Sequence, residues 1–170
     1  MDLQEFKIKV LPARQKLYRL ALFLLRDKEE AEDILQDVFL KLWTQKEKLQ
    51  AYNSIEALAM SIAKNLCLDK LKACKRRQLV DVAGMEISSE DVNPYQYSEL
   101  TDSMSNMQLL LENLPEQQKL VLHLRDVEGY SFEEIEQITG FTVNNLRVIL
   151  SRARKSVRDG FLKLENYEVR

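Results

Sequence analysis

The chain has 170 residues and a net charge of −2, and its 45% hydrophobic and 31% charged residues are ordinary for a soluble globular protein that buries a core. With only four glycines and three prolines, the sequence favours an all-α fold. No apolar stretch approaches the ~20 residues of a membrane span, and the first residues lack a signal-peptide pattern. A cytoplasmic protein without membrane insertion is therefore expected.

The N-terminal part predicts three or four helices. The first is expected from near Glu5 to Arg26, with a kink or break at Pro12. Asp27 followed by Glu30 is a capping pattern, so the next helix should begin there and continue to about Lys46. Its residues at core spacing are Ala31, Ile34, Leu35, Val38 and Leu42.

After a predicted loop over residues 45–53, Ser54 can cap a further helix. The residues expected on its inward stripe are Ile55, Leu58, Ala59, Ile62 and Leu66. Cys67 and Cys74 lie too far apart along this helix for a disulfide and are interpreted as small buried hydrophobic residues. The second half of this helix is strongly basic and contains one acid, Asp69. Its cations are Lys64, Lys70, Lys72, Lys75, Arg76 and Arg77.

Charge is arranged in blocks along the chain. Residues 79–118 contain eight acids and no lysine or arginine, whereas residues 143–163 are basic again. Breakers and polar residues predict a flexible acidic linker over 79–103. We therefore expect two small helical domains, residues 1–78 and 104–170, that contact a polyanion at two places.

The segment from Leu114 to Val157 has the pattern of a helix-turn-helix. Pro115 suits the first turn of a helix that ends at Gly129. The residues expected on the buried side of that helix are Leu120, Val121, Leu124 and Val127.

The two helices that follow carry clear end signals. Ser131 and Glu134 form a capping box for the first, in which Ile135 and Ile138 face inward. Gly140 can end that helix in the left-handed conformation, and Thr142 can cap the next. On this last helix an apolar seam is expected to contain Leu146, Leu150, Ala153 and Val157.

The polar half of the last helix is expected to contact DNA, because such helices enter the major groove with their N-terminal residues at the base edges. The candidate base readers are Asn144, Asn145, Arg147 and Val148, with Thr142 and Ser151 beside them. The candidate phosphate contacts are Arg152, Arg154, Lys155 and Arg158. A charged surface helix in a protein-binding bundle is the alternative interpretation.

Nothing in the sequence indicates catalysis. No serine or cysteine nucleophile has a plausible histidine partner, and the single histidine, His123, is interpreted as a helix residue without a chemical role. The cysteines lack further metal ligands nearby, and there is no glycine-rich phosphate loop. We expect no cofactor and no enzyme.

Three segments resemble the extracytoplasmic-function sigma factors of bacterial RNA polymerase. Residues 31–43 (AEDILQDVFLKLW) resemble their polymerase-binding helix, and residues 62–69 (IAKNLCLD) resemble the start of their promoter-melting helix. The segment from Leu114 to Arg154 resembles their C-terminal domain. The resemblance spans nearly the whole chain, with the motifs in the family's order.

The resemblance implies a role for each segment. The second helix would dock on the clamp coiled coil of the polymerase largest subunit through Asp33, Gln36, Asp37 and Lys41. The loop near residues 49–53 would capture an unstacked base of the minus-ten element. The residues implied to contact that element are Tyr52, Asn53, Lys64, Asn65, Lys72, Lys75, Arg76 and Arg77. The last helix would read the minus-thirty-five element, and an anti-sigma protein is a further partner that the resemblance implies.

The sequence thus predicts a transcription initiation factor that binds core RNA polymerase, directs it to specific promoters and helps melt the DNA. One alternative is a helix-turn-helix regulator that never joins polymerase, and the Asp33, Gln36 and Asp37 face argues against it. Another is a helical scaffold or adaptor, which would lack the steep salt dependence of DNA binding. An enzyme is a distant third.

Overall fold

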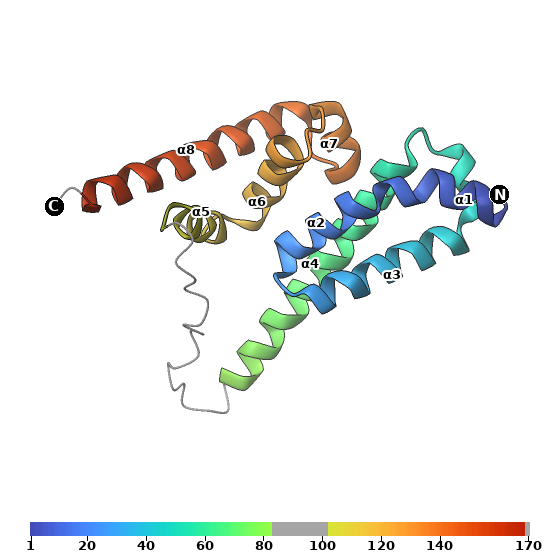
Figure 1. The fold of residues 1–170 in the computed structure, drawn as a ribbon, viewed down its shortest axis with the longest axis horizontal. Coiled ribbons are helices and arrows are strands. Elements are labelled where there is room, and N and C mark those ends of the chain that lie inside the picture. The colour runs from blue at the N-terminus through green and yellow to red at the C-terminus, as the bar shows by residue number, and fades with distance from the viewer. Residues whose placement is uncertain (83–101, 169–170) are drawn as a thin grey trace.

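The computed structural model describes residues 1–82 and 102–168, and its regular elements are helices (Figure 1). The N-terminal part contains α1 (Leu3–Val10), η1 (Leu11–Ala13), α2 (Arg14–Leu25), α3 (Lys28–Thr44), η2 (Lys46–Ala51) and α4 (Ile55–Val82). The C-terminal part contains α5 (Asp102–Glu112), α6 (Glu116–Leu122), η3 (His123–Val127), α7 (Phe132–Thr139) and α8 (Val143–Glu168). The predicted all-α class is confirmed.

Local sequence signals account for the ends of the N-terminal helices. Pro12 lies in the 3-10 turn η1, which separates α1 from α2 at the predicted break. Arg26 ends α2 in the left-handed conformation (φ 59°), and the Asp27 carboxylate accepts hydrogen bonds from the backbone N–H groups of Glu29 and Glu30. Ser54 caps α4 by accepting a 3.0 Å hydrogen bond from the Ala57 N–H, as expected.

Helices α2, α3 and α4 pack side by side around the N-terminal core (Figure 1). All five residues predicted at core positions of α3 are buried. The 45–53 segment is not simply a loop, because the wholly buried Leu49 anchors the 3-10 helix η2. Most of the linker predicted over 79–103 lies outside the described residues, although α4 extends four residues beyond the expected domain end at 78.

The inward stripe predicted for α4 is confirmed in part, since all five of its residues lie in or against the hydrophobic core. Of its members Ala59 is buried, whereas Ile55, Leu58, Ile62 and Leu66 are half-buried. The residues that α4 buries are Ala57, Ala59, Met60, Ala63 and Cys67. This helix packs against α2 and α3 and also against α7, so mostly small side chains occupy its central face. The second cysteine is exposed, which contradicts the expected burial of Cys74.

In the C-terminal part, α6 and α7 pack against α8 and bury a further set of apolar side chains. The Ser131–Glu134 capping box is present with both of its hydrogen bonds, and Gly140 ends α7 with φ 79°. Thr142 caps α8 by accepting from the Asn145 N–H at 3.2 Å. The residues buried here include Leu120, Val121, Leu124, Ile135, Ile138, Leu146, Ile149, Leu150 and Ala153.

One predicted member of this core is misplaced. Val127 is 61% exposed, because η3 is a π-helical turn. A π turn contains one more residue than an α turn, which rotates the following side chains away from the face that the 3.6-residue period predicts. Gly129 then reverses the chain with φ 76°.

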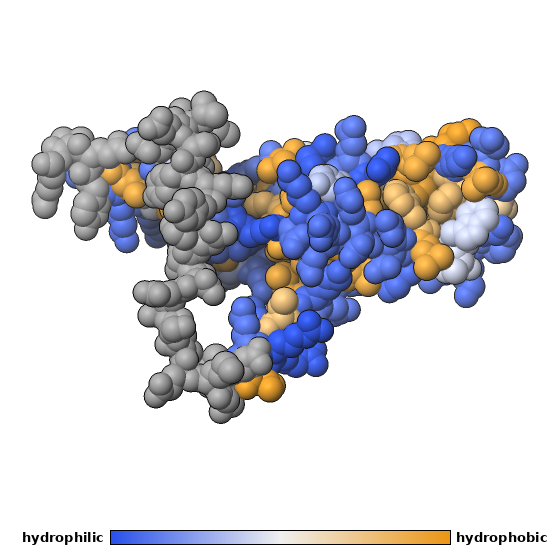
Figure 2. Space-filling model, turned by 60° about the horizontal axis from the view of Figure 1, so that its bottom comes forward, coloured by the Kyte–Doolittle hydropathy of each residue, from blue (hydrophilic) through white to orange (hydrophobic). Residues whose placement is uncertain are grey.

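The two parts are packed together. Helix α7 lies against α4, and buried residues of both parts belong to one continuous hydrophobic cluster. Figure 2 shows a mostly hydrophilic face, with patches of apolar surface toward the end of the molecule that holds the N-terminus. None of the helices in the described part of the chain combines the length and apolarity needed to cross a bilayer.

Candidate nucleic-acid interface

The outer face of α3 carries the residues that the resemblance assigns to polymerase docking. Asp33, Gln36, Asp37 and Lys41 are all exposed, on the side of the helix opposite its buried stripe. Leu40, which sequence reasoning did not single out, lies in the same stripe and is 62% exposed. Covering this side chain with a partner would remove apolar surface from water, which favours association. The sequence could have indicated this position, because Leu40 is three residues from Asp37 and four from Gln36, and residues at that spacing lie on the same side of a helix.

A hollow of about 430 Å³ lies beside η2, at the segment expected to capture an unstacked base. Tyr52 and Asn53, which the resemblance assigns to the minus-ten element, line it, and Tyr52 is 47% exposed. Gln50 and Glu56 also line the hollow, although the sequence did not single them out. Glu56 lies beyond the predicted loop, in the first turn of α4. The hollow thus combines an aromatic ring with amide and carboxylate groups, which is chemically suited to a nucleobase.

The cations of α4 extend along the helix away from this hollow. Lys64 is half-buried, and burial lowers the pKa of its ammonium group. Asn65, Lys72, Lys75, Arg76 and Arg77 are exposed. Lys75 is not free, since its Nζ atom lies 2.8 Å from the carboxylate of Glu116 in the C-terminal part.

The predicted DNA-facing half of α8 is exposed throughout. The exposed members are Thr142, Asn144, Asn145, Arg147, Val148, Ser151, Arg152, Arg154, Lys155 and Arg158. The guanidinium of Arg154 is already engaged, because its Nε and Nη2 atoms lie 3.1 and 2.5 Å from the two carboxylate oxygens of Asp126. A phosphate contact through Nε or Nη2 of Arg154 therefore requires this ion pair to open.

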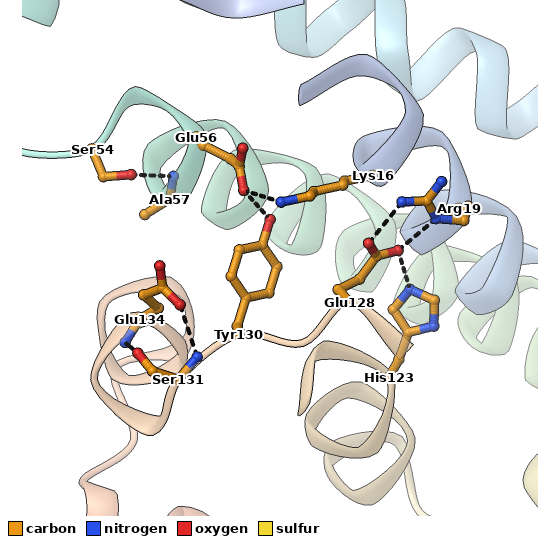
Figure 3. Close-up of polar contacts among 10 residues, drawn as sticks. All are labelled: Lys16, Arg19, Ser54, Glu56, Ala57, His123, Glu128, Tyr130, Ser131 and Glu134. Atoms are coloured by element: carbon orange, nitrogen blue, oxygen red, sulfur yellow. Dashed lines mark hydrogen bonds and ion pairs between the residues drawn. The ribbon is translucent and has the colours of Figure 1, made fainter. Parts of the chain in front are cut away.

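Two carboxylates connect the N-terminal and C-terminal parts (Figure 3). Glu56 of α4 accepts hydrogen bonds from Nζ of Lys16 (2.7 Å) and from the hydroxyl of Tyr130 (2.6 Å). Burial would raise the pKa of Glu56, but these hydrogen bonds bring it below its usual value. Burial and the hydrogen bond to Glu56 raise the pKa of Tyr130 strongly.

The second carboxylate, that of Glu128, accepts both Nε and Nη2 of Arg19 at 2.8 Å each, and this pair lowers its pKa. Nε2 of His123 lies 3.3 Å from the same carboxylate. The His123 ring stacks on the ring of Phe23 of α2, with 4.7 Å between the two centroids. We call the following residues the interdomain clasp: Lys16, Arg19, Glu56, His123, Glu128 and Tyr130.

The fold and these surfaces define a helical DNA-binding protein built around a helix-turn-helix. Family models agree: the one described as Sigma-70 region 2 matches residues 11–77, and the one described as Sigma-70, region 4 matches residues 104–157. The chain belongs to the sigma-70 family, within the extracytoplasmic-function sigma factors, which are transcription initiation factors. This membership decides against the regulator and scaffold alternatives.

Individual relatives are distant. The ECF RNA polymerase sigma factor SigE of Mycolicibacterium smegmatis is 28% identical over 153 residues, covering 87% of this chain but only 58% of that protein. The RNA polymerase sigma factor SigV of Bacillus subtilis is 27% identical, covering 85% of this chain and 84% of its own. The sigma factor RpoE from Bartonella quintana, solved with the anti-sigma factor NepR, is similar in fold with a TM-score of 0.73 at 23% identity; 94% of this chain and 98% of that chain are covered.

Proposed function

We propose that this chain joins core RNA polymerase, directs it to promoters with minus-ten and minus-thirty-five elements, and helps to separate the strands. The observation that carries the proposal is the presence of three exposed surfaces on one chain of this family. They are the polar face of α3, the hollow beside η2 with the cations of α4, and the polar half of α8.

The polar face of α3 is proposed to dock on the clamp coiled coil of the polymerase largest subunit. Asp33, Gln36, Asp37 and Lys41 contribute nothing to the core, because the opposite stripe of α3 supplies the buried side chains. Leu40 is proposed as the apolar centre of this face, surrounded by polar groups that exclude water once the partner is bound.

The hollow beside η2 is proposed to receive one base of the minus-ten element. Extruding a base costs a few kcal/mol. Stacking on an aromatic ring such as Tyr52 returns about 1–3 kcal/mol per base, and Gln50 and Asn53 offer amide groups to its edge. Lys72, Arg76 and other exposed cations of α4 would follow the sugar-phosphate backbone of the displaced strand.

The start of α8 is proposed to read the minus-thirty-five element. Asn144, Asn145 and Arg147 lie in its first two turns, where a recognition helix meets the base edges. Asn and Arg side chains form bidentate hydrogen bonds with adenine and guanine, respectively. The cations further along α8 would contact phosphates, which add affinity without sequence information.

The remaining expectations follow from this role. The chain itself would catalyse no reaction and need no cofactor, because polymerase performs the chemistry. It would work in the cytoplasm, where chromosomal DNA and polymerase are found. The likeness to a sigma factor solved with an anti-sigma factor supports the proposal that a protein of that kind also binds this chain.

Co-purification with core polymerase tests the docking face. Gln36→Ala combined with Asp37→Ala should abolish co-purification while leaving helicity intact. The matched control is Glu136→Ala combined with Gln137→Ala on α7, since it removes the same pair of exposed groups from another helix. Normal polymerase binding by the α3 variant, or an equal loss in the control, would place the docking face elsewhere.

A further inference from the structure

An open cavity of about 610 Å³ lies between α2 and three C-terminal elements, α5, α6 and η3. This volume falls within the range of about 300–1,000 Å³ in which proteins hold small molecules. Its apolar wall consists of Leu22, Phe23, Met107, Leu111 and Val127. None of its lining residues belongs to the surfaces proposed to meet polymerase or DNA, so the proposed function leaves this cavity without a role.

The apolar wall includes side chains that the fold leaves in water. Val127 is 61% exposed and Met107 is 38% exposed. Val127 has this position because η3 is a π-helical turn, a rare geometry that occurs frequently at functional sites. A hydrocarbon chain in the cavity would remove these side chains from water, which favours binding.

Cations gather at the same cavity. Arg19, Arg26 and Lys119 line it, together with one carboxylate, that of Glu112. Arg19 is already held by Glu128 in the interdomain clasp. Arg26 forms an ion pair with Glu112, but a guanidinium has five N–H groups and a bidentate carboxylate binds only two of them. Arg26 can therefore bind a further anion.

Lys119 is a cation without a partner of its own. This half-buried side chain forms no ion pair with any residue in the part of the chain that the structure describes. Burial, and after it the positive charge of Arg26, lowers the pKa of its ammonium group, although Glu112 and Glu116 act in the opposite direction. An anion beside Lys119 would stabilise the charged form. The cavity thus joins an apolar wall to a cationic corner that lacks one negative charge.

We propose that this cavity binds an amphipathic carboxylate of the fatty-acid class, with its hydrocarbon tail on the apolar wall and its carboxylate between Arg26 and Lys119. A neutral lipid would leave the ammonium group of Lys119 unpaired, and a short acid would leave the apolar wall in water. The site is independent of the proposed function, because neither polymerase nor DNA takes part in it.

Calorimetric titration of the full chain tests the site with three probes. Octanoate has both the head group and the tail, 1-octanol has the same tail without the charge, and butanoate has the head group with four methylenes fewer. We expect about one octanoate per chain, with a dissociation constant below ~1 mM. Because each buried methylene contributes about fourfold in affinity, butanoate should bind at least ~10-fold more weakly. Loss of the charge should make 1-octanol bind about fivefold more weakly.

Two variants locate the ligand. Lys119→Gln should weaken octanoate binding about fivefold and leave 1-octanol binding unchanged, whereas Lys7→Gln removes an exposed lysine of α1 and should change neither. Met107→Glu places a negative charge on the apolar wall and should weaken octanoate binding at least ~10-fold. Its matched control is Leu109→Glu, because this exposed leucine of the same helix does not line the cavity. The altered side chains are exposed or half-buried, so we expect unchanged helicity.

Absence of saturable octanoate binding to the unaltered chain would overturn the inference. Equal affinity for octanoate and 1-octanol would overturn it as well, because the ligand would then ignore the cationic corner. Equal losses in Met107→Glu and Leu109→Glu would place the ligand outside the cavity and have the same consequence. None of these titrations involves polymerase or DNA, so each result leaves the proposed function to its own tests.

Discussion

The guanidinium carbon of Arg147 lies 5.6 Å from the centroid of the Phe132 ring, so the first residue of α7 supports a cation on α8. Arg125 lies over the same ring at 4.7 Å and donates a 2.8 Å hydrogen bond to the Tyr130 carbonyl oxygen. A cation within about 6 Å of an aromatic face is attracted by its negative potential. The ring thus restricts where Arg147 points before DNA arrives.

Arg147→Ala should cost ~1–3 kcal/mol of promoter binding and relax the preference at one base pair, because a bidentate contact to a base is lost. Competition binding with duplexes changed at single positions of the minus-thirty-five element measures both effects. Arg158→Ala is the control, since a phosphate contact should weaken all duplexes equally. Unchanged affinity and preference in Arg147→Ala would remove it from the base readers.

Asp126→Asn should strengthen DNA binding. The Asp126 carboxylate holds both Nε and Nη2 of Arg154, and the neutral amide releases this cation for a phosphate. One additional phosphate contact should steepen the slope of log affinity against log salt by about 1. A salt titration of DNA binding checks this, and an unchanged slope would show that Arg154 stays away from DNA even when free.

The stability of the fold should fall on mild acidification because of His123. Burial lowers the pKa of this imidazole, and the facing Glu128 carboxylate offsets this only in part, while Arg19 lowers it further. The unfolded chain then binds the proton more tightly than the folded one, so stability is lost as pH falls through about 6.5. Glu56 and Glu128, whose pKa values are lowered, stay ionised in this window.

Urea unfolding at about pH 5.5 and 7.5 measures this effect. We expect a smaller free energy of unfolding at the lower pH, and His123→Phe, which keeps a ring stacked on Phe23, should remove most of the difference. If the unaltered chain has the same free energy of unfolding at both pH values, protonation of His123 does not affect the stability of the fold.

A protease site placed in the predicted linker tests the domain division. After cleavage we expect two folded pieces, because each part has its own capped helices and core residues. The pieces should stay associated, because α7 packs against α4 within one hydrophobic cluster, and added salt should weaken only the share of this association that the ion pairs contribute. Loss of all helicity in one cooperative step on cleavage would contradict the division into residues 1–78 and 104–170.

Sequence patterns predicted what depends on neighbours along the chain. The buried stripe of α3, the Ser131–Glu134 capping box and the left-handed Gly140 all follow from helical periodicity and end signals within a few residues. The exposure of Arg147 on α8 was predictable for the same reason.

Features set by distant residues could not be predicted in this way. Tyr130 and Glu56 are 74 positions apart, and no periodicity links them. Helix α4 packs against α7 as well as against α2 and α3, so its most buried residues include Ala57, Met60 and Ala63, which one inward stripe did not predict. The π turn of η3 exposed Val127 because it breaks the 3.6-residue period on which the prediction relied.

The central claim is that this chain confers promoter specificity on polymerase, and reconstituted initiation tests it most directly. Core polymerase lacking any specificity factor is mixed with the purified chain and fragmented genomic DNA, and the 5′ ends of the RNA are sequenced. We predict transcripts that begin at a few defined positions, only when the chain is present, each preceded by two shared sequence elements. A chain that neither associates with the core enzyme nor yields RNA from any defined start would contradict the account.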